Sequence, residues 1–240
     1  MDFCPGGELF YNMTKRPKFS EKEAKFIFCE AFLGVEYLHE HNILYRDLKV
    51  NLISQPQPEN VLLDIDGHIK LTDFGLSKEL TSRDQISYSF CGSPEYMSPE
   101  MLKGDGHGPL LDYYTLGVLL FEMLHGLPPH YSKNTDLMYQ RIKFEAVEIP
   151  RNMTGAVRSF LQHLLAKNPE DRLGAKGGLA EIKQHPWLAD VKWNDKKALK
   201  EKPLWAPSLR SGNIDTEYVN TPIDKGIRDI KIVNGEIANN

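Results

Sequence analysis

Three short motifs contain the residue types best suited to chemistry. The sequence has YRDLK at 45–49, DFG at 73–75 and SPE at 98–100. The first follows an expected helix, the second an expected hairpin, and the third precedes an expected buried helix. A lone Asp-Phe-Gly usually marks only a turn, but the three motifs in this order are far more specific. Their acidic and basic side chains suit a reaction that depends on positioning and neutralising charge.

Together the motifs resemble the C-terminal lobe of a eukaryotic serine/threonine protein kinase. The resemblance implies transfer of a phosphoryl group from ATP, with Mg²⁺ as the metal cofactor. Asp47 would accept the proton of the substrate hydroxyl, and Lys49 would steady the γ-phosphate. Asp73 would hold Mg²⁺ against the phosphates. A tyrosine kinase is disfavoured, because Lys49 and the segment 92–95 resemble the serine/threonine type.

Further motifs are similar to the AGC group, which includes cyclic-AMP-dependent kinase, protein kinase B and the ribosomal-protein kinases. Tyr45 stands where most kinases have His, as is usual in that group. The segment FCGSPEY at 90–96 matches its activation segment, with Ser93 in place of the commoner Thr. Trp193 and PLWAP at 203–207 resemble the C-terminal extension of the group. The extension's usual final aromatic motif is not visible in 223–240.

The catalytic loop departs from the family pattern by an insertion. The family continues from the loop Lys directly into Pro-Glu-Asn, whereas here residues 50–57 intervene. Asn60 would be the second Mg²⁺ ligand, yet it follows Asp47 by 13 residues instead of 5. Asn51 is the alternative ligand, disfavoured because the family pattern resumes intact at 58–63. The added length costs only about 1 kcal/mol of closure entropy, so the fold can tolerate it.

The insertion has two possible origins. Val codons begin with GT and Gln can be encoded by CAG, so Val50–Gln57 fits a retained, very short intron whose in-frame removal restores the family motif. The alternative is a genuine surface insertion. Catalysis is less forgiving than folding, since a misplacement of about 1 Å can cost on the order of 100-fold in rate.

The resemblance also assigns the nucleotide site. Met1 aligns with the gatekeeper, Asp2 and Cys4 with the hinge that bonds adenine, and Leu62 with the residue beneath the adenine ring. Glu8 is expected beside the nucleotide as well. Cys4 could instead be a buried apolar side chain, and the role of Leu62 is compatible with a place in the hairpin core.

Three carboxylates align with positions that select basic residues near the target Ser or Thr: Glu8, Glu59 and Glu122. If all three face the cleft, they would favour Arg-rich substrates by charge pairing. The alternative is that they are simply solvated. Ser93 lies in the activation segment and is expected to contact the substrate.

Four further positions are assigned structural roles and one a regulatory role. Glu100 and Arg172 match a buried ion pair that braces the substrate-binding segment, and Asp112 matches the anchor of the catalytic loop. Ser89 aligns with the activation-segment phosphosite, and Arg46 would pair with its phosphate. The alternative is an ordinary loop serine, one of several in 82–89.

The elements that must position these residues are mainly helical, with one small β-hairpin. Ser20 and Glu23 form a capping-box pattern before a periodic helix over 20–40. Asp66-Gly67 predicts a hairpin over 61–72. An almost wholly apolar stretch at 112–126 predicts a buried helix, and residues 79–90 an exposed loop. Shorter helices are expected at 134–144, 155–166 and 179–185.

The expected organisation is a truncated kinase fold. Residues 1–187 would form the hinge and C-terminal lobe, 188–222 the AGC extension, and 223–240 a disordered tail. The chain opens within a motif, which suggests a truncated start. No Gly-rich phosphate loop, Val-Ala-x-Lys strand or partner Glu helix is found. We therefore expect the chain alone to bind Mg-ATP poorly and to phosphorylate little.

The amino-acid composition limits the kinds of partner and the cellular location that we expect. The 240 residues are 41% apolar and 26% charged with a net charge of −4, which argues against nucleic acid and predicts a globular protein. Three separated cysteines suit reduced thiols, and no apolar run long enough to span a membrane occurs. The expected compartment is the cytoplasm, with the nucleus as the alternative. The expected partners are proteins with basic residues near Ser/Thr and an upstream activating kinase.

A rival interpretation comes from another functional class. A kinase-like lobe could be a non-catalytic module that binds partner proteins. The missing lobe and the insertion favour this, whereas the intact Asp47, Lys49 and Asp73 oppose it.

Overall fold

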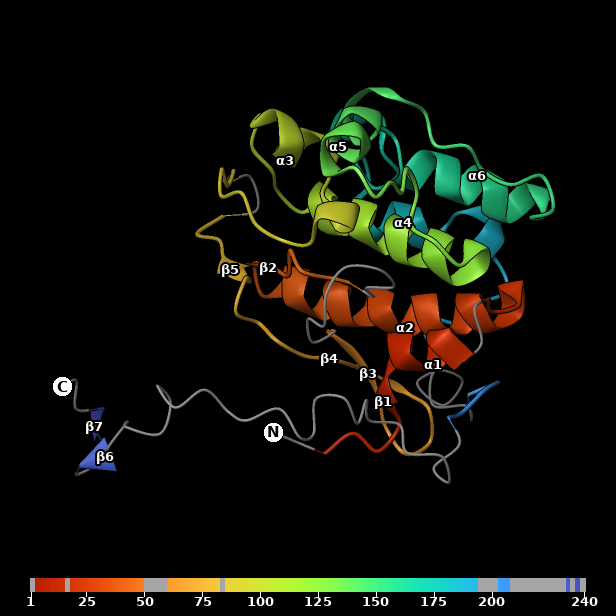
Figure 1. Cartoon of the computed structure of the whole chain (residues 1–240), viewed down its shortest axis with the longest axis horizontal. Coiled ribbons are helices and arrows are strands. Elements are labelled where there is room, and N and C mark those ends of the chain that lie inside the picture. The colour runs from red at the N-terminus through yellow and green to blue at the C-terminus, as the bar shows by residue number, and fades with distance from the viewer. Residues whose placement is uncertain are drawn as a thin grey trace.

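The computed structural model describes residues 3–15, 18–49, 60–82, 85–193, 203–207, 232–233 and 236–237. Helices dominate, as the sequence predicts (Figure 1). The α-helices are α1 Leu9–Lys15, α2 Glu21–Glu40, α3 Pro99–Lys103, α4 Leu110–His125, α5 Thr135–Phe144, α6 Gly155–Leu164 and α7 Gly178–Lys183. The strands are β1 Gly7–Glu8, β2 Ile43–Leu44, β3 Val61–Leu63, β4 Ile69–Leu71, β5 Lys78–Glu79, β6 Ile232–Val233 and β7 Glu236–Ile237.

The predicted hairpin is present as β3 and β4, but it is not isolated. β1 adds to β3 to give an antiparallel sheet with the order β1-β3-β4. A second antiparallel pair joins β2 to β5. The sequence missed these short strands, and also α1 and α3, because two to seven residues carry too little periodicity to identify an element. β6 and β7 pair within 223–240, and the proposed domain boundaries stay predictions.

The helix α2 begins where the capping box predicts. The Ser20 hydroxyl accepts a hydrogen bond from the Glu23 backbone N–H, and the Glu23 carboxylate accepts one from the Ser20 N–H at 2.9 Å. Both satisfy backbone donors that a helix N-terminus leaves free. The buried face of α2 then packs along α4 (Figure 1).

The central helix α4 is buried nearly all round, as its apolar composition predicts. It lies between α2 and α6 and ends at Gly126, whose φ of 93° is readily adopted only by glycine. Phe28, Phe160 and Trp187 extend this core, with ring centroids 4.8–5.7 Å apart. The result is a rigid platform beneath the motif-bearing loops.

The segment 203–207 packs against the hairpin turn. Trp205 makes an edge-to-face contact with Phe19, with centroids 5.4 Å apart. Gly67 has a φ of 94°, and a Cβ there would lie 2.8 Å from the Trp205 carbonyl oxygen. This close approach therefore requires glycine.

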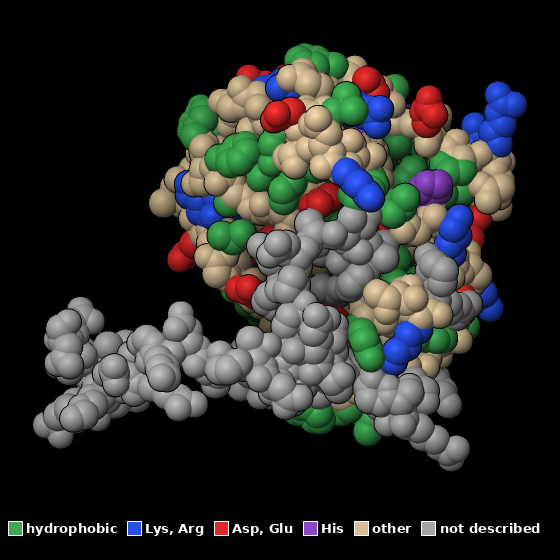
Figure 2. Space-filling view, viewed as in Figure 1, with side chains coloured by type: hydrophobic (Ala, Val, Ile, Leu, Met, Phe, Trp, Pro, Cys, Tyr) green, Lys and Arg blue, Asp and Glu red, His purple; other side chains and the backbone are tan. Residues whose placement is uncertain are grey.

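The surface in the view of Figure 2 mixes acidic, basic and apolar side chains without a block of one charge. No helix within the described ranges combines the length and the apolarity needed to cross a membrane.

The capping box gives a stability prediction. Ser20→Ala removes the hydroxyl acceptor and should lower the free energy of unfolding by about 1 kcal/mol, measured by denaturant titration. Ser82→Ala is the matched control, because no hydrogen bond of the Ser82 side chain is found among the described residues. Equal stability of the Ser20 and Ser82 variants would contradict the role of the cap.

Candidate active site

The loop that carries Asp47 is held by one buried carboxylate on α4. Asp112, which is fully buried, accepts hydrogen bonds from the backbone N–H of Tyr45 at 2.9 Å and of Arg46 at 2.8 Å. His39 Nε2 lies 2.7 Å from the same carboxylate and donates to it. Arg46 has a φ of 67°, a conformation that is uncommon outside glycine. The Asp112 bonds offset this strain and fix the direction of the following residue.

Tyr45 links the catalytic loop to the segment after β4. Its hydroxyl donates to the Thr72 carbonyl at 2.5 Å and lies 3.3 Å from the Asn60 carbonyl. Burial, and then the nearby carboxylates, raise the pKa of Tyr45, so the hydroxyl remains a neutral donor. Phe74 contacts the Tyr45 ring edge-on at 5.6 Å. The first and second motifs are thus brought together.

Asp47, Lys49 and Asn60 form one cluster despite the insertion. Lys49 Nζ lies 3.1 Å from Asp47 Oδ2, and Asn60 Nδ2 donates to the same oxygen at 2.6 Å and to the Asp47 carbonyl at 2.8 Å. Although the insertion separates Asn60 from Asp47 in the sequence, the structure places the two side chains in contact. The alternative ligand Asn51 lies outside the described residues.

One oxygen of Asp47 remains available for chemistry. Within the described part of the chain, Asp47 Oδ1 and Asn60 Oδ1 are buried acceptors without a hydrogen-bond donor. Burial raises the pKa of Asp47, while the charge of Lys49 and the hydrogen bonds from Lys49 and Asn60 oppose the shift. A carboxylate with a raised pKa and a free oxygen suits the acceptance of a hydroxyl proton.

Asp73 lies near Asp47 but is exposed. It has a φ of 53°, and its Oδ1 accepts a hydrogen bond from the Gly75 N–H at 3.0 Å. Its negative charge contributes to raising the pKa of Asp47. Asn60 and Asp73 offer the hard oxygen ligands that Mg²⁺ prefers, so the residues fit this ion. No cluster of three His, Cys, Asp or Glu side chains that could hold a metal ion occurs in the described ranges.

The predicted partners Glu100 and Arg172 form a buried, bidentate ion pair. Arg172 Nη1 and Nη2 donate to the two Glu100 oxygens at 2.8 and 2.9 Å. Burial alone would raise the pKa of Glu100, but the bonds and charge of Arg172 lower it. Arg172 also donates to the Leu110 carbonyl at 2.7 Å and stacks on Tyr114. The pair therefore ties α3 to the start of α4.

The residues assigned to the nucleotide lie around β1 and β3. Glu8 in β1 pairs directly with Leu62 in β3. Cys4 is half-buried, which does not separate a hinge role from that of an apolar side chain, and its carbonyl accepts from Gly7 N–H at 3.0 Å. Met1 and Asp2 lie outside the described residues.

The carboxylates assigned to substrate selection are not alike. Glu122 is fully buried in α4 and accepts a hydrogen bond from the Tyr96 hydroxyl, so it neither faces an open cleft nor is solvated. Burial raises its pKa to about 8, the Tyr96 bond opposes this, and Glu95 adds to it. Glu8 is half-buried, and Glu59 lies outside the described residues. The idea of three carboxylates facing the cleft therefore needs correction at Glu122.

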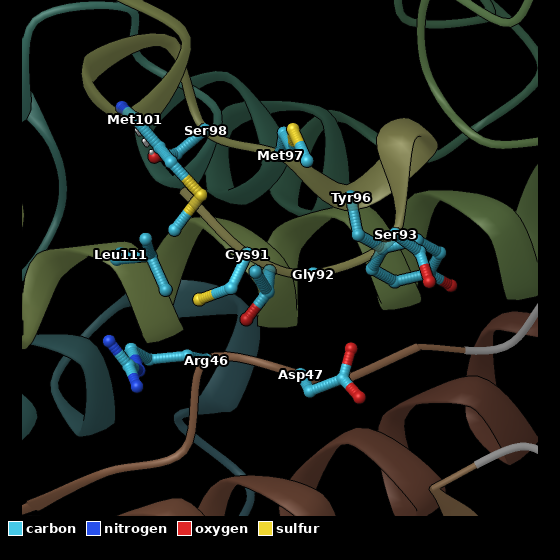
Figure 3. Close-up of a pocket in the computed structure, with 11 residues that line it drawn as sticks. Arg46, Asp47, Cys91, Gly92, Ser93, Tyr96, Met97, Ser98, Met101 and Leu111 are labelled. Carbon is cyan, nitrogen blue, oxygen red and sulfur yellow. Dashed lines mark hydrogen bonds between the residues drawn. The ribbon is translucent and has the colours of Figure 1, made fainter. Parts of the chain in front are cut away.

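The segment around Ser93 covers the catalytic loop. Ser93 is buried, and its hydroxyl has no hydrogen-bond partner among the residues the structure describes. It lines a small cavity together with Asp47 and Cys91. Figure 3 shows the Arg46 and Asp47 side chains pointing in opposite directions from this loop. The side chains of Asp47 and Arg46 therefore lie in different surroundings.

The predicted phosphosite Ser89 is exposed. Arg46 instead donates to the Ser87 hydroxyl, at 3.2 Å, and to the Leu76 carbonyl, at 2.7 Å. The predicted partners Ser89 and Arg46 are therefore not in contact in the unmodified protein.

The comparisons with known proteins agree with this geometry. The model of the protein kinase domain matches residues 1–188. The chain belongs to the protein kinase family.

Curated relatives of this kinase domain lie in the AGC group. Protein kinase 2 of Dictyostelium discoideum is 43% identical over 212 residues, which cover 88% of this chain and 42% of the relative. Serine/threonine-protein kinase gad8 of Schizosaccharomyces pombe is 41% identical over 232 residues, which cover 95% of this chain and 39% of the relative. Human serine/threonine-protein kinase Sgk1 is 40% identical over 231 residues, which cover 95% of this chain and 52% of the relative. The chain spans about two fifths to one half of these relatives.

Sequence reasoning missed several residues that organise the site of this kinase domain. His39 lies on the buried face of α2, but its contact with Asp112 can be recognised only once the position of α4 is known. Tyr96 as the partner of Glu122 had no signal beyond its place in the activation segment. Lys78, which contacts Ser87, follows the Asp-Phe-Gly motif closely but belongs to no motif of its own.

The buried carboxyl of Glu122 predicts that the stability of the kinase domain depends on pH. In the unfolded chain the carboxyl ionises near pH 4.5, whereas in the folded protein it keeps its proton to about pH 8. Between these pH values, ionisation of the carboxyl stabilises the unfolded state only. The free energy of unfolding therefore falls by at most about 1.4 kcal/mol per pH unit. Glu122→Gln cannot ionise and should become progressively more stable than the wild type from pH 5 to pH 8.

Denaturant titrations at several pH values would measure this difference. Glu170→Gln, on the exposed surface, is the control and should follow the wild type throughout. If the curves of the Glu122 variant and the wild type ran parallel, the carboxyl would be ionised in the folded protein.

Proposed function

We propose that this chain contains the catalytic lobe of a serine/threonine protein kinase, which transfers the γ-phosphate of ATP to Ser or Thr of protein substrates. The observation that carries the proposal is the cluster at Asp47. One carboxylate oxygen is held by Lys49 and Asn60, and the other has no donor within the described residues. The relatives named as serine/threonine-protein kinases support the same conclusion.

In this proposal each residue has a limited task. Asp47 accepts the proton of the substrate hydroxyl through its free oxygen, while Lys49 positions the transferred phosphate. Asn60 and Asp73 hold Mg²⁺, which would neutralise charge on the phosphates when bound. Asp2, Cys4, Glu8 and Leu62 surround the nucleotide, and Ser93 contacts the substrate segment.

The activity proposed for the complete protein need not reside in this chain. The sequence contains no Gly-rich phosphate loop and no Val-Ala-x-Lys strand. Since these cradle the phosphates in the family, the 240-residue chain alone should transfer phosphate weakly. The same observation supports the second candidate function, a non-catalytic module that binds partner proteins.

The remaining regulatory and cellular assignments also belong to the proposal. An upstream protein kinase would phosphorylate Ser89, and the protein would act in the cytoplasm or the nucleus.

The proposed chemistry is tested by removing the base. In the complete gene product, Asp47→Asn should lower the rate of γ-phosphate transfer to a Ser peptide by about 10²–10⁴-fold. Asp66→Asn, an exposed aspartate in the hairpin turn, is the matched control and should retain full activity. Transfer by the 240-residue chain should be weak from the outset. An inactive complete product with intact Asp47 would favour the binding module.

Substrate preference gives an independent test. With Glu122 buried, selection for basic residues depends on Glu8 and Glu59. The complete product should prefer a Ser peptide with upstream Arg over one with Gln, and Glu8→Gln should reduce that ratio of kcat/KM about tenfold. Glu122→Gln, which leaves the surface unchanged, should preserve the ratio. An unchanged ratio in the Glu8 variant would remove Glu8 from substrate selection.

A further inference from the structure

A cavity of about 730 Å³ lies between the C-terminal end of α4 and the segment that follows α5. Its lining consists of Phe121 and His125 of α4, the loop 127–131, Arg141 of α5 and residues 145–148. Sites for small molecules measure about 300–1,000 Å³, so the volume is that of an ordinary ligand site. The cluster around Asp47 is not part of this lining, and the proposed phosphoryl transfer does not use the cavity.

The loop that forms one wall is held in a fixed conformation. Pro128 and Pro129 are buried, and their rings restrict φ. His130 follows them with a φ of 63°, which is sparsely populated outside glycine. Such a conformation persists only where surrounding contacts enforce it, and it occurs often at ligand sites.

The contact that enforces the conformation of His130 comes from a lysine. Lys167 Nζ donates to His130 Nε2 at 2.8 Å, to the Ile142 carbonyl at 2.7 Å and, over 3.5 Å, to the Arg141 carbonyl. Among the described residues no carboxylate forms an ion pair with Lys167. Burial, and then the charge of Arg172, lower the pKa of Lys167 to about 8, so the amine still carries its proton at pH 7.

This bond fixes the tautomer of His130. An ammonium group can only donate, so Nε2 is the acceptor and the proton of the neutral ring lies on Nδ1. Burial, and then the charge of Lys167, lower the pKa of His130 to about 4, which keeps the ring neutral. Within the described part of the chain, Nδ1 has no hydrogen-bond partner. The cavity is therefore lined by an N–H donor that the ammonium polarises and that lacks an acceptor.

The charges around the cavity favour an anion at this donor. Lys167 lies behind His130 and is half-buried, and the Arg141 side chain is 38% exposed. The carboxylates of the lining are more open to solvent: Glu145 is 62% exposed and lies 3.7 Å from Arg141, and Glu148 is exposed. Because water and salt screen exposed charges most, the positive groups act more strongly inside the cavity.

The remainder of the lining is largely apolar. Phe121 and the two proline rings are buried, and Val147 is half-buried. A ligand that satisfies the Nδ1–H donor must therefore also bring an apolar body to cover these side chains.

We propose that this cavity binds a small apolar carboxylic acid in its ionised form. One carboxylate oxygen accepts the hydrogen bond from His130 Nδ1–H, and the apolar body lies against Phe121 and Pro128. The site goes beyond the proposed transfer of phosphate, because it lies on other elements and needs neither ATP nor Asp47.

Naphthoate, a flat aromatic carboxylate, is a suitable probe for the 240-residue chain. In a titration followed by saturation-transfer NMR, it should bind with a Kd of about 1 mM, which is typical of a ligand of this size. Naphthylmethylammonium has the same rings and the opposite charge, and it should bind at least about tenfold more weakly. No saturation by naphthoate up to about 10 mM, or equal binding of the two compounds, would overturn the proposal.

Variants test the role assigned to His130. His130→Phe keeps a ring and removes the donor, so the Kd for naphthoate should rise at least about tenfold. Glu148→Gln removes an opposing charge and should lower that Kd about twofold. Glu40→Gln, an exposed position on α2 outside the lining, is the matched control and should leave the Kd unchanged. Unchanged binding by the His130 variant would exclude Nδ1–H as the anchor.

The tautomer can be measured without any ligand. In the chain labelled with ¹⁵N-histidine, His130 should show a protonated Nδ1 and an unprotonated Nε2 at pH 7. Lys167→Gln should abolish this preference, whereas Glu40→Gln should preserve it. A proton on Nε2 in the wild type would contradict the donor on which the site depends. This measurement also decides the question if His130→Phe does not fold, and it is independent of kinase activity.

Discussion

The catalytic loop depends on a single carboxylate buried in the central helix. Asp112 accepts two consecutive backbone N–H groups, and a third bond comes from His39. Because α4 is enclosed by α2 and α6, this acceptor cannot exchange its partners for water. Arg46 can then hold a positive φ, which sends its side chain one way and that of Asp47 the other. The side chain of Asp47, the proposed base, and that of its neighbour Arg46 are thus adjacent in the chain but lie in different surroundings.

The same arrangement explains why the insertion leaves the cluster intact. The loop is fixed at its start by Asp112, and β3 fixes the chain at its end, where Asn60 returns to Asp47. Among the described residues, these anchors are the Asp112 hydrogen bonds and the pairing of β3 with β1 and β4. Added length between two anchored ends changes the closure entropy only slightly.

What the sequence predicted well was local. The capping box of α2, the apolar run of α4 and the Asp66-Gly67 turn each depend on neighbours within a few residues, and the structure contains all three. The contact of Glu122 with Tyr96 depends on where a distant segment crosses α4, which no spacing encodes. Motif matching places Glu122 on the correct helix, but it cannot give the depth of the carboxylate. Likewise, the convergence of Arg46 and Lys78 on Ser87 arises only after β2 pairs with β5.

The contact between Trp205 and the hairpin turn has a consequence for the order of folding. Phe19 and Gly67 leave the ribosome long before Trp205 is synthesised, so the surface that they share stays uncovered for most of translation. Pairings between residues so distant in the chain form late and slow the overall rate.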